Sequence, residues 1–451
     1  MNNEPGILKT LFANPALVVT LIIIIGLILS PTGADVGGLK QGTVGIASSG
    51  KIWRVITIGL AAFIILGLFM SNPTKRFKAM FAGNLRYLTL YACLALLTVV
   101  FSQLKTMTIF KGVEVLLICM LGAIIATSRD REASAITFTK GVFWIYTIST
   151  FSALIELAVF GSAHHKQLVG ETPLLATQME SSYPPMVGNG LGYLGALTAL
   201  FGIYRFDSPG ARTRIKGIAL IILGAGATIL FLSYTRSVLL FFIISVLMIA
   251  AFEKRTIRIG IIMITMVSLL AVPGVQDKVV DHLKRGSTDE QIGSLSNRIN
   301  FWEAIFKRDP VQLMVGEGFA TGTLFQNSDG GASSKIFTQR NAHNSVVEII
   351  MSSGVIGAAI WLTIIGRMAV QMVKIRRKLR NMKDWAALHF HHLMMGVLLL
   401  SALRSTMNST FVYVDYFFFV FLSLIMYCET LSLSLLKAPK ISSKFRPIAL
   451  R

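Results

Sequence analysis

Long apolar runs alternate with short polar connections along almost the whole chain. The runs lie at 14–30, 52–70, 85–101, 109–127, 141–160, 188–204, 217–232, 237–252, 259–273, 350–373, 390–403 and 411–430. A helix needs about 20 apolar residues to cross a hydrocarbon core about 30 Å thick. Several runs are shorter, so tilted or broken spans are expected. The pattern predicts an all-α polytopic membrane protein with about 12 transmembrane helices.

The composition agrees with a chain that is dissolved in a bilayer. Hydrophobic residues make up 53% of the 451 positions and charged residues only 14%. A net charge of +21 would suggest nucleic-acid binding in a soluble protein. Here the Lys and Arg residues gather in short clusters between apolar runs, where they set topology. We therefore expect no nucleic-acid partner.

The basic clusters fall in every second connection, which orients the predicted spans. More than half of the 43 Lys and Arg residues belong to them. By the positive-inside rule these connections are cytoplasmic, and the even number of spans places both termini there. The first run lacks a strongly basic start and a cleavage site, so it is expected to remain as a span. The clusters are at 75–86, 129–140, 205–216, 254–258 and 374–383, with Lys9 and the 437–451 tail.

The opposite, outer face carries one large polar segment. We expect spans one to nine within 1–272, a large outer loop at 273–345, spans ten to twelve within 346–436, and a basic cytoplasmic tail at 437–451. The loop contains SLSNRINFWEAIFKRDP, in which Ser294 or Ser296 can cap a helix and Pro310 can stop it. Its apolar positions, Trp302 among them, recur at helical spacing. This predicts an amphipathic helix lying at the membrane surface.

Positive charges on the outer face are unexpected, because topology does not require them there. Arg236 stands between two apolar runs in LFLSYTRSVLLFF, and Arg298 lies on the predicted surface helix. Arg404 ends the eleventh run, and Arg340 lies in the large loop. Each can be an ordinary interfacial or solvated arginine. Alternatively they bind an anion, since a planar five-donor guanidinium in a partly desolvated site suits a diphosphate.

His343 follows the large loop and directly precedes an amphipathic helical pattern in RNAHNSVVEIIMSSGVIG. A side chain with a near-neutral pKa at the membrane boundary is a natural general base for a sugar hydroxyl. The plainer alternative is a polar loop residue. We expect neither a metal nor another cofactor. The zinc motif HExxH is absent, and a metal site on the outer face would need grouped carboxylates, whereas the first outer loop offers only Asp35. No Walker motif is present, which argues against an ATP-driven pump.

Three motifs in this order resemble the O-antigen ligase and polymerase superfamily. They are an arginine between two late spans (SYTRS), an arginine-bearing amphipathic segment with a Gly-rich turn (NRINFWEAIFKRDPVQLMVGEGFATG), and an HN pair that opens the next span (HNSVVEIIMSSGVIG). The resemblance is concentrated in residues 217–373. Before this segment the chain is similar only as a series of spans.

The resemblance implies a metal-independent, inverting glycosyl transfer at the periplasmic face of a bacterial inner membrane. The donor would be an undecaprenyl-diphosphate-linked glycan and the acceptor a sugar hydroxyl. His343 would act on the acceptor hydroxyl, while Arg236 and Arg298 would hold the departing diphosphate. Asn344 and Glu348 can orient the loop or the imidazole. Glu348 can equally be a carboxylate favoured by the helix dipole.

Four interpretations remain at this point. The first is a polymerase that joins repeat units of exopolysaccharide or O-antigen, with a flippase and a chain-length regulator as partners. The second is a ligase that transfers finished glycan to lipid A core. The third is a secondary transporter or flippase for an anionic lipid or sugar, which predicts unusual charges in both halves at mid-membrane. The last, a structural subunit, leaves His343 and the outer arginines unexplained.

Overall fold

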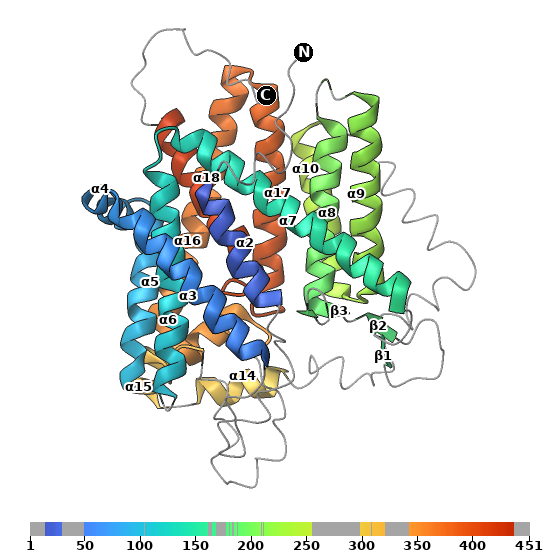
Figure 1. Ribbon diagram of the computed structural model, residues 1–451. Helices are drawn as coiled ribbons and strands as arrows, with labels where there is room; N and C mark the ends of the chain where they lie inside the picture. The colour runs from blue at the N-terminus through green and yellow to red at the C-terminus, as the bar shows by residue number, and fades with distance from the viewer. Residues whose placement is uncertain are drawn as a thin grey trace. The chain divides into compact units, whose positions relative to one another are not determined.

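The computed structural model describes the chain in parts, most of them helical (Figure 1). The described residues are 14–28, 49–102, 104–160, 165–167, 177–179, 181–182, 185–186, 188–208, 210, 212–254, 298–307, 309–320 and 342–436. They form two compact units. Unit 1 combines Met1–Val142, Asn300–Lys383 and Ser405–Arg451, and unit 2 combines Phe143–Ile299 with Asp384–Arg404.

Unit 1 is a helical bundle built around a central helix, α18 (Phe418–Leu431). Every residue of α18 is buried, although its sequence is apolar enough to face lipid. The other elements are α2 (Pro15–Ile28), α3 (Ser49–Met70), α4 (Pro73–Met80), α5 (Leu85–Leu97), η2 (Thr98–Val100), α6 (Lys105–Ala126), the start of α7 (Arg131–Phe160), most of α14 (Arg298–Phe306), α15 (Pro310–Val315), α16 (Ser345–Met382) and η5 (Ser432–Leu436).

Unit 2 contains the rest of α7 with α8 (Gly188–Asp207), α9 (Thr213–Leu232), α10 (Arg236–Phe252) and α17 (Trp385–Ser405). Helices α8 and α9 approach closely through small residues. A Cβ atom on Gly195 would lie 2.6 Å from the Gly226 carbonyl oxygen. Such small-residue contacts let membrane helices pack backbone to backbone. Two short antiparallel pairs precede α8: β1 (His165–Gln167) with β2 (Thr177–Met179), and β3 (Ser181–Ser182) with β4 (Pro185–Met186).

The helices are those of a multi-pass membrane protein. Six helices in the described ranges are long and apolar enough to cross a membrane, or seven if α3 and α4, bent by 110°, form one span. Large apolar side chains such as Phe63 stay exposed, 77% in its case, as expected for a surface in contact with lipid. Each predicted apolar run contains a described helix except 259–273, which lies outside the described residues. The number of about 12 spans stays a prediction.

Several boundaries differ from those predicted. The run 411–430 is helical only from Phe418, because residues 411–417 form an irregular segment with side-chain partners on α16. The predicted surface helix is present as α14, but it ends at Phe306 and Pro310 does not stop it. Instead, Pro310 opens α15, where its missing N–H is harmless, and the Asp309 carboxylate caps that helix. The candidate caps Ser294 and Ser296 lie outside the described residues.

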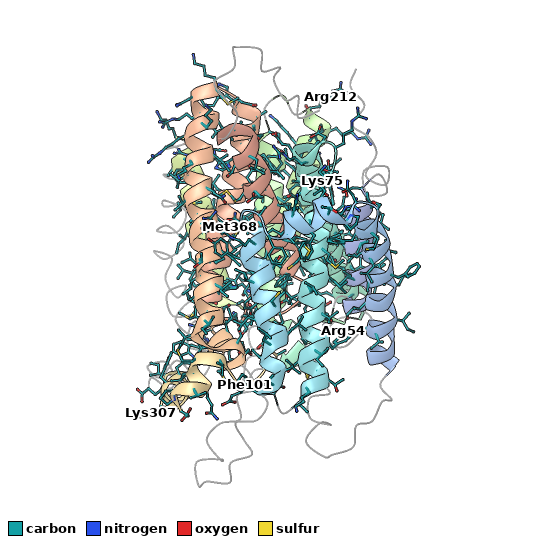
Figure 2. All side chains as sticks on the ribbon, turned by 90° about the vertical axis from the view of Figure 1, so that its left-hand side faces the viewer. Arg54, Lys75, Phe101, Arg212, Lys307 and Met368 are labelled. Carbon is teal, nitrogen blue, oxygen red and sulfur yellow. The ribbon has the colours of Figure 1, made fainter. Side chains whose placement is uncertain are left out.

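Residues predicted on opposite sides of the membrane lie toward opposite ends of unit 1 (Figure 2). Lys75, from a predicted cytoplasmic cluster, lies toward one end, and Phe101 and Lys307 lie toward the other. Near the Phe101 end, Arg54 on α3 donates to the Glu114 carboxylate on α6 at 3.0 Å, and Lys111 lies 2.9 Å from the same group. This buried ionic contact joins α3 to α6 and was not predicted.

Helix α16 is broken near its start, and the break accommodates α15. Ser353 and Gly354 have non-helical backbone angles, with φ of Gly354 at +70° and ψ at −178°. The carbonyl of Met351 accepts the Glu317 N–H at 2.9 Å. A Cβ atom on Gly354 would lie 2.0 Å from the Met314 carbonyl oxygen. Only glycine fits here, because both the backbone angle and the close approach exclude a side chain.

We expect Gly354→Ala to destabilise unit 1 by about 3 kcal/mol or more, since strain and a backbone collision act together. The measurement is thermal unfolding of the purified protein in detergent. Gly366→Ala is a matched control on the same helix, because its Cβ would meet no atom within 4 Å. That variant should be neutral or stabilising by up to about 1 kcal/mol. Equal unfolding temperatures for the two variants would contradict the break.

Candidate functional site

His343 lies in a constrained turn immediately before α16. Its φ of +51° is in the left-handed region, which few residues other than glycine adopt. The Asn344 side chain caps α16 by accepting the N–H groups of Val346 and Val347 at 2.9 and 3.2 Å. The same side chain donates to the Thr406 carbonyl at 3.1 Å. Asn344, the residue after His343, is therefore held both by the first turn of α16 and by Thr406.

The residue before His343 is fixed equally well. The Ala342 N–H donates to Glu348 Oε2 at 2.9 Å, and the Ala342 carbonyl accepts the indole N–H of Trp302 at 2.9 Å. Ala342 also belongs to a buried apolar cluster with Ile305, Val347 and Met351, against which Trp302 packs. Helix α14 and the start of α16 together hold this turn. His343 is half-buried between two fully bonded neighbours.

Glu348 is the buried acceptor at the centre of this arrangement, with 1% of its surface exposed. Besides the Ala342 N–H it accepts the Tyr413 hydroxyl at 2.8 Å and the Ser409 hydroxyl at 3.2 Å. An ionised carboxylate has only acceptor sites, so three converging donors suit it. Glu348 is thus a structural partner of the turn and not merely a charge near a helix start. From the sequence, Glu348 was expected to be able to orient this loop, whereas Tyr413 and Ser409 were not expected to contribute.

The irregular segment between α17 and α18 brings these donors to α16. The Ser345 hydroxyl lies 3.0 Å from the Asn408 carbonyl oxygen, and it accepts the Thr410 N–H at 2.8 Å. The Ser352 hydroxyl lies 2.8 Å from the Tyr413 oxygen. Since Tyr413 donates to Glu348, Ser352 donates to Tyr413. Burial, and secondarily the Glu348 charge, raise the pKa of Tyr413 well above its ordinary value, so its hydroxyl remains a donor.

Arg298 is the first residue of α14, one helical turn before Trp302. The rest of this helix packs in unit 1 through Trp302 and Ile305. Burial lowers the pKa of Arg298 from its ordinary value, yet an arginine remains cationic in a protein. The predicted surface helix is therefore anchored by its apolar face, while Ile299 and Phe306 stay exposed.

Arg236 and Arg404 belong to unit 2, where both approach the start of α8. Arg236 opens α10 after a short turn, and the hydroxyl of the preceding Thr235 donates to the Gly188 carbonyl at 2.9 Å. Arg404, only 5% exposed, donates to the Asn189 carbonyl at 3.4 Å. Its guanidinium lies 4.3 Å from the centre of the Tyr193 ring. Thr235, which precedes Arg236, and Arg404 thus both contact the first residues of α8.

Other parts of the molecule add less to this picture. Arg340 lies outside the described residues. Across the ranges described, no group of three or more His, Cys, Asp or Glu side chains could hold a metal ion, and the expectation of metal-independent chemistry stays a prediction.

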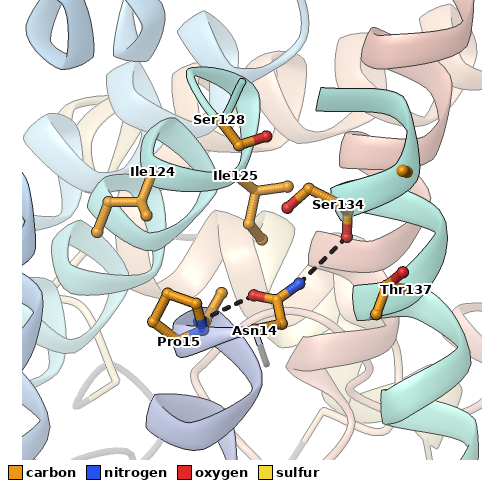
Figure 3. A pocket seen from close by; sticks show the side chains of 9 residues that line it. Asn14, Pro15, Ile124, Ile125, Ser128, Ser134 and Thr137 are labelled. Atoms are coloured by element: carbon orange, nitrogen blue, oxygen red, sulfur yellow. Dashed lines mark hydrogen bonds between the residues drawn. The ribbon is translucent and has the colours of Figure 1, made fainter. Parts of the chain in front are cut away.

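A cavity of about 330 Å³ in unit 1 is lined by Asn14, Ile125, Ser134 and Thr137 (Figure 3). It adjoins the α6–α7 turn that Lys75 contacts at Thr127, and His343 is not among the residues that line it.

Comparison with known families addresses the segment that carries most of these residues. Residues 218–362 match the O-antigen ligase family. The match confirms the resemblance to the O-antigen ligase and polymerase superfamily, and it spans α9, α10, α14, α15 and the start of α16. Arg236, Arg298 and His343 lie inside it, whereas Arg404 and Tyr413 lie beyond its end. A search of curated proteins found no match.

The family match carries a coarse functional statement. The O-antigen ligase family concerns glycosyl transfer, with lipid-linked glycans and membrane lipids as the molecules it handles. Together, the apolar helices and the match indicate a multi-pass membrane protein whose residues 218–362 resemble this family. Polymerase and ligase share the family, so the acceptor is a matter for proposal.

Proposed function

We propose that the protein is a polymerase that joins undecaprenyl-diphosphate-linked oligosaccharide repeat units at the periplasmic face of a bacterial inner membrane. The observation that carries this proposal is the constrained turn at His343. It combines a left-handed backbone, a cap by Asn344 and a bond from Ala342 to buried Glu348, all inside the O-antigen ligase match. Strained and over-determined backbone is typical of functional sites.

In the proposed reaction, an acceptor sugar hydroxyl attacks the anomeric carbon of the donor glycan. His343 takes the hydroxyl proton as the new C–O bond forms. The bond from the anomeric carbon to the diphosphate breaks, and undecaprenyl diphosphate leaves with the electron pair. Attack opposite the leaving group inverts the anomeric centre. The step needs no metal or other cofactor, because cationic side chains can stabilise the leaving group.

The arginines are proposed to bind the donor diphosphate. Arg236 and Arg298 are the principal cations, and Arg404 is a supporting one. Negative charge on the diphosphate grows as it departs, so fixed guanidinium groups favour the transition state over the bound substrate. Arg404 and Thr235, the residue before Arg236, both contact the start of α8, which supports a shared role for the two arginines.

The test is reconstitution of the purified protein with undecaprenyl-diphosphate-linked repeat units in the presence of a chelator, with product length read on a gel. We expect a ladder of polymer and release of undecaprenyl diphosphate. No product under these conditions, but product after addition of a divalent cation, would refute the metal-independent mechanism. No product in either case would refute the polymerase.

A ligase that transfers lipid-linked glycan to lipid A core is the second candidate, because the family description itself names that activity. The two activities differ only in the acceptor. Reconstitution with lipid A core as the sole acceptor separates them: a single transfer indicates the ligase, whereas no transfer, together with polymer formed from repeat units alone, indicates the polymerase. A polymerase would work beside a flippase that supplies the donor and a regulator of chain length.

A further inference from the structure

A series of hydrogen bonds runs from Ser352 through Tyr413, in the segment between α17 and α18, to the turn that carries His343. Ser352 donates to Tyr413 at 2.8 Å, Tyr413 donates to Glu348 at 2.8 Å, and Glu348 accepts the Ala342 N–H at 2.9 Å. Each link joins parts of the chain that are distant in sequence except the last. These bonds therefore connect the segment 405–417 to Ala342, the residue before His343.

We propose that Tyr413 and Glu348 are a positioning pair that fixes the His343 turn for proton transfer. This inference rests on the proposed function, since it assigns the pair to the same reaction. Neither side chain has to touch substrate in this role. Glu348 is 1% exposed, and its oxygens already accept three donors.

The physical reason is the conformation of His343. A left-handed φ of +51° is uncommon for a residue other than glycine, so we expect the turn to relax when the bonds that hold it are removed. Asn344 fixes one side of the turn, while Glu348 and Trp302 fix the other. Without the Tyr413 hydroxyl, Glu348 keeps its charge but loses the donor at Oε1, which frees the carboxylate to rotate away from Ala342.

Tyr413 suits this task because its protonation does not change under working conditions. Burial raises its pKa well above the ordinary value of 10, so the hydroxyl donates to Glu348 throughout the neutral range. The ring is also fixed, with its centre 5.3 Å from that of Phe319 in an edge-to-face contact. Tyr413→Phe should therefore leave the ring in place and delete only the donor.

The test compares kcat and KM of Tyr413→Phe and Glu348→Gln in the reconstituted assay. We expect kcat to fall by about 10²-fold, the typical effect of a misplaced catalytic group. KM for the lipid-linked donor should change little, because the diphosphate-binding arginines are untouched. Since both substitutions break one contact, the double variant should be no worse than the more impaired single variant.

Controls separate positioning from folding. Tyr427→Phe deletes the hydroxyl of a buried tyrosine on α18 in the same unit and should retain kcat. If Tyr413→Phe fails to fold, Ser409→Ala removes a weaker donor from the same carboxylate at a half-buried position, and should lower kcat less. A well-folded Tyr413→Phe with normal kcat, or an equal loss in Tyr427→Phe, would overturn the positioning pair.

A third variant, His343→Ala, distinguishes an error in the positioning pair from an error in the proposed function. Loss of activity in His343→Ala with normal kcat in Tyr413→Phe overturns the positioning pair alone. Normal activity in His343→Ala overturns both assignments. Loss in His343→Ala together with a kcat-specific loss in Tyr413→Phe is the expected result.

Discussion

His343→Ala is expected to abolish polymer growth in the reconstituted assay while the protein still inserts and folds. A general base contributes about 10²–10⁴-fold to such a transfer, and further loss is expected if water cannot replace the imidazole in the constrained turn. Alanine removes a half-buried side chain and leaves in place the residues that hold the turn, namely Ala342 with its backbone bonds and Asn344 with its cap. Product length on a gel measures the activity, and thermal unfolding in detergent measures the fold.

His165→Ala is the matched control for His343→Ala. His165 lies on β1 of unit 2, in the connection between the runs 141–160 and 188–204. That connection carries none of the basic clusters, so the positive-inside rule places it on the outer face with His343. That variant should make polymer of normal length. Near-normal product length in His343→Ala would remove the catalytic assignment, whatever the control shows.

Local sequence patterns predicted those features that depend on neighbouring residues. The apolar runs located the helices, and the two runs on either side of Arg236 required a short turn, which the structure has between Leu232 and Arg236. The helical pattern after His343 is present as the start of α16, with Asn344 as its cap. Short-range features of this kind are fixed by hydrophobic periodicity and capping.

The rest depends on contacts between distant segments. Residues 411–417 are as apolar as a span, so they were predicted to be part of a helix. The structure leaves them irregular, because bonds to α16 replace helical ones: Tyr413 binds Glu348, 65 positions away. The Ser, Thr and Asn residues at 405–410 are a turn signal, but they precede the predicted run and give no reason to shorten it. No pattern within either segment shows that the two segments meet.

The segment that matches the O-antigen ligase family ends before some of the residues that hold the His343 turn. It ends at residue 362, so it includes His343 and Glu348 but not the segment that carries Tyr413 and Arg404. The break of α16 at Gly354 lies inside the match, and it is occupied by the turn after α15. The matched segment therefore supplies the proposed base, and a later segment supplies the groups that hold its turn.

Replacement of the proposed diphosphate ligands should give a different kinetic signature from loss of the base. We expect Arg236→Ala and Arg298→Ala each to lower kcat by about 10²–10³-fold, the usual effect of deleting one preorganised donor. KM for the donor should rise less, because the diphosphate carries more charge as it leaves than when it is bound. Lysine at either position keeps the charge but loses the bidentate fork, so its effect should be intermediate.

Arg205→Lys is the matched control for the lysine variants. Arg205 lies in the last turn of α8, at the opposite end of that helix from Asn189, with its guanidinium 5.9 Å from the centre of the Trp144 ring. It is an arginine of unit 2 in a predicted cytoplasmic cluster, so Arg205→Lys should retain kcat. Full activity in both Arg236→Lys and Arg298→Lys would show that neither guanidinium fork binds the diphosphate. A loss confined to KM would assign them to substrate binding alone, because only an interaction that strengthens in the transition state lowers kcat when it is removed.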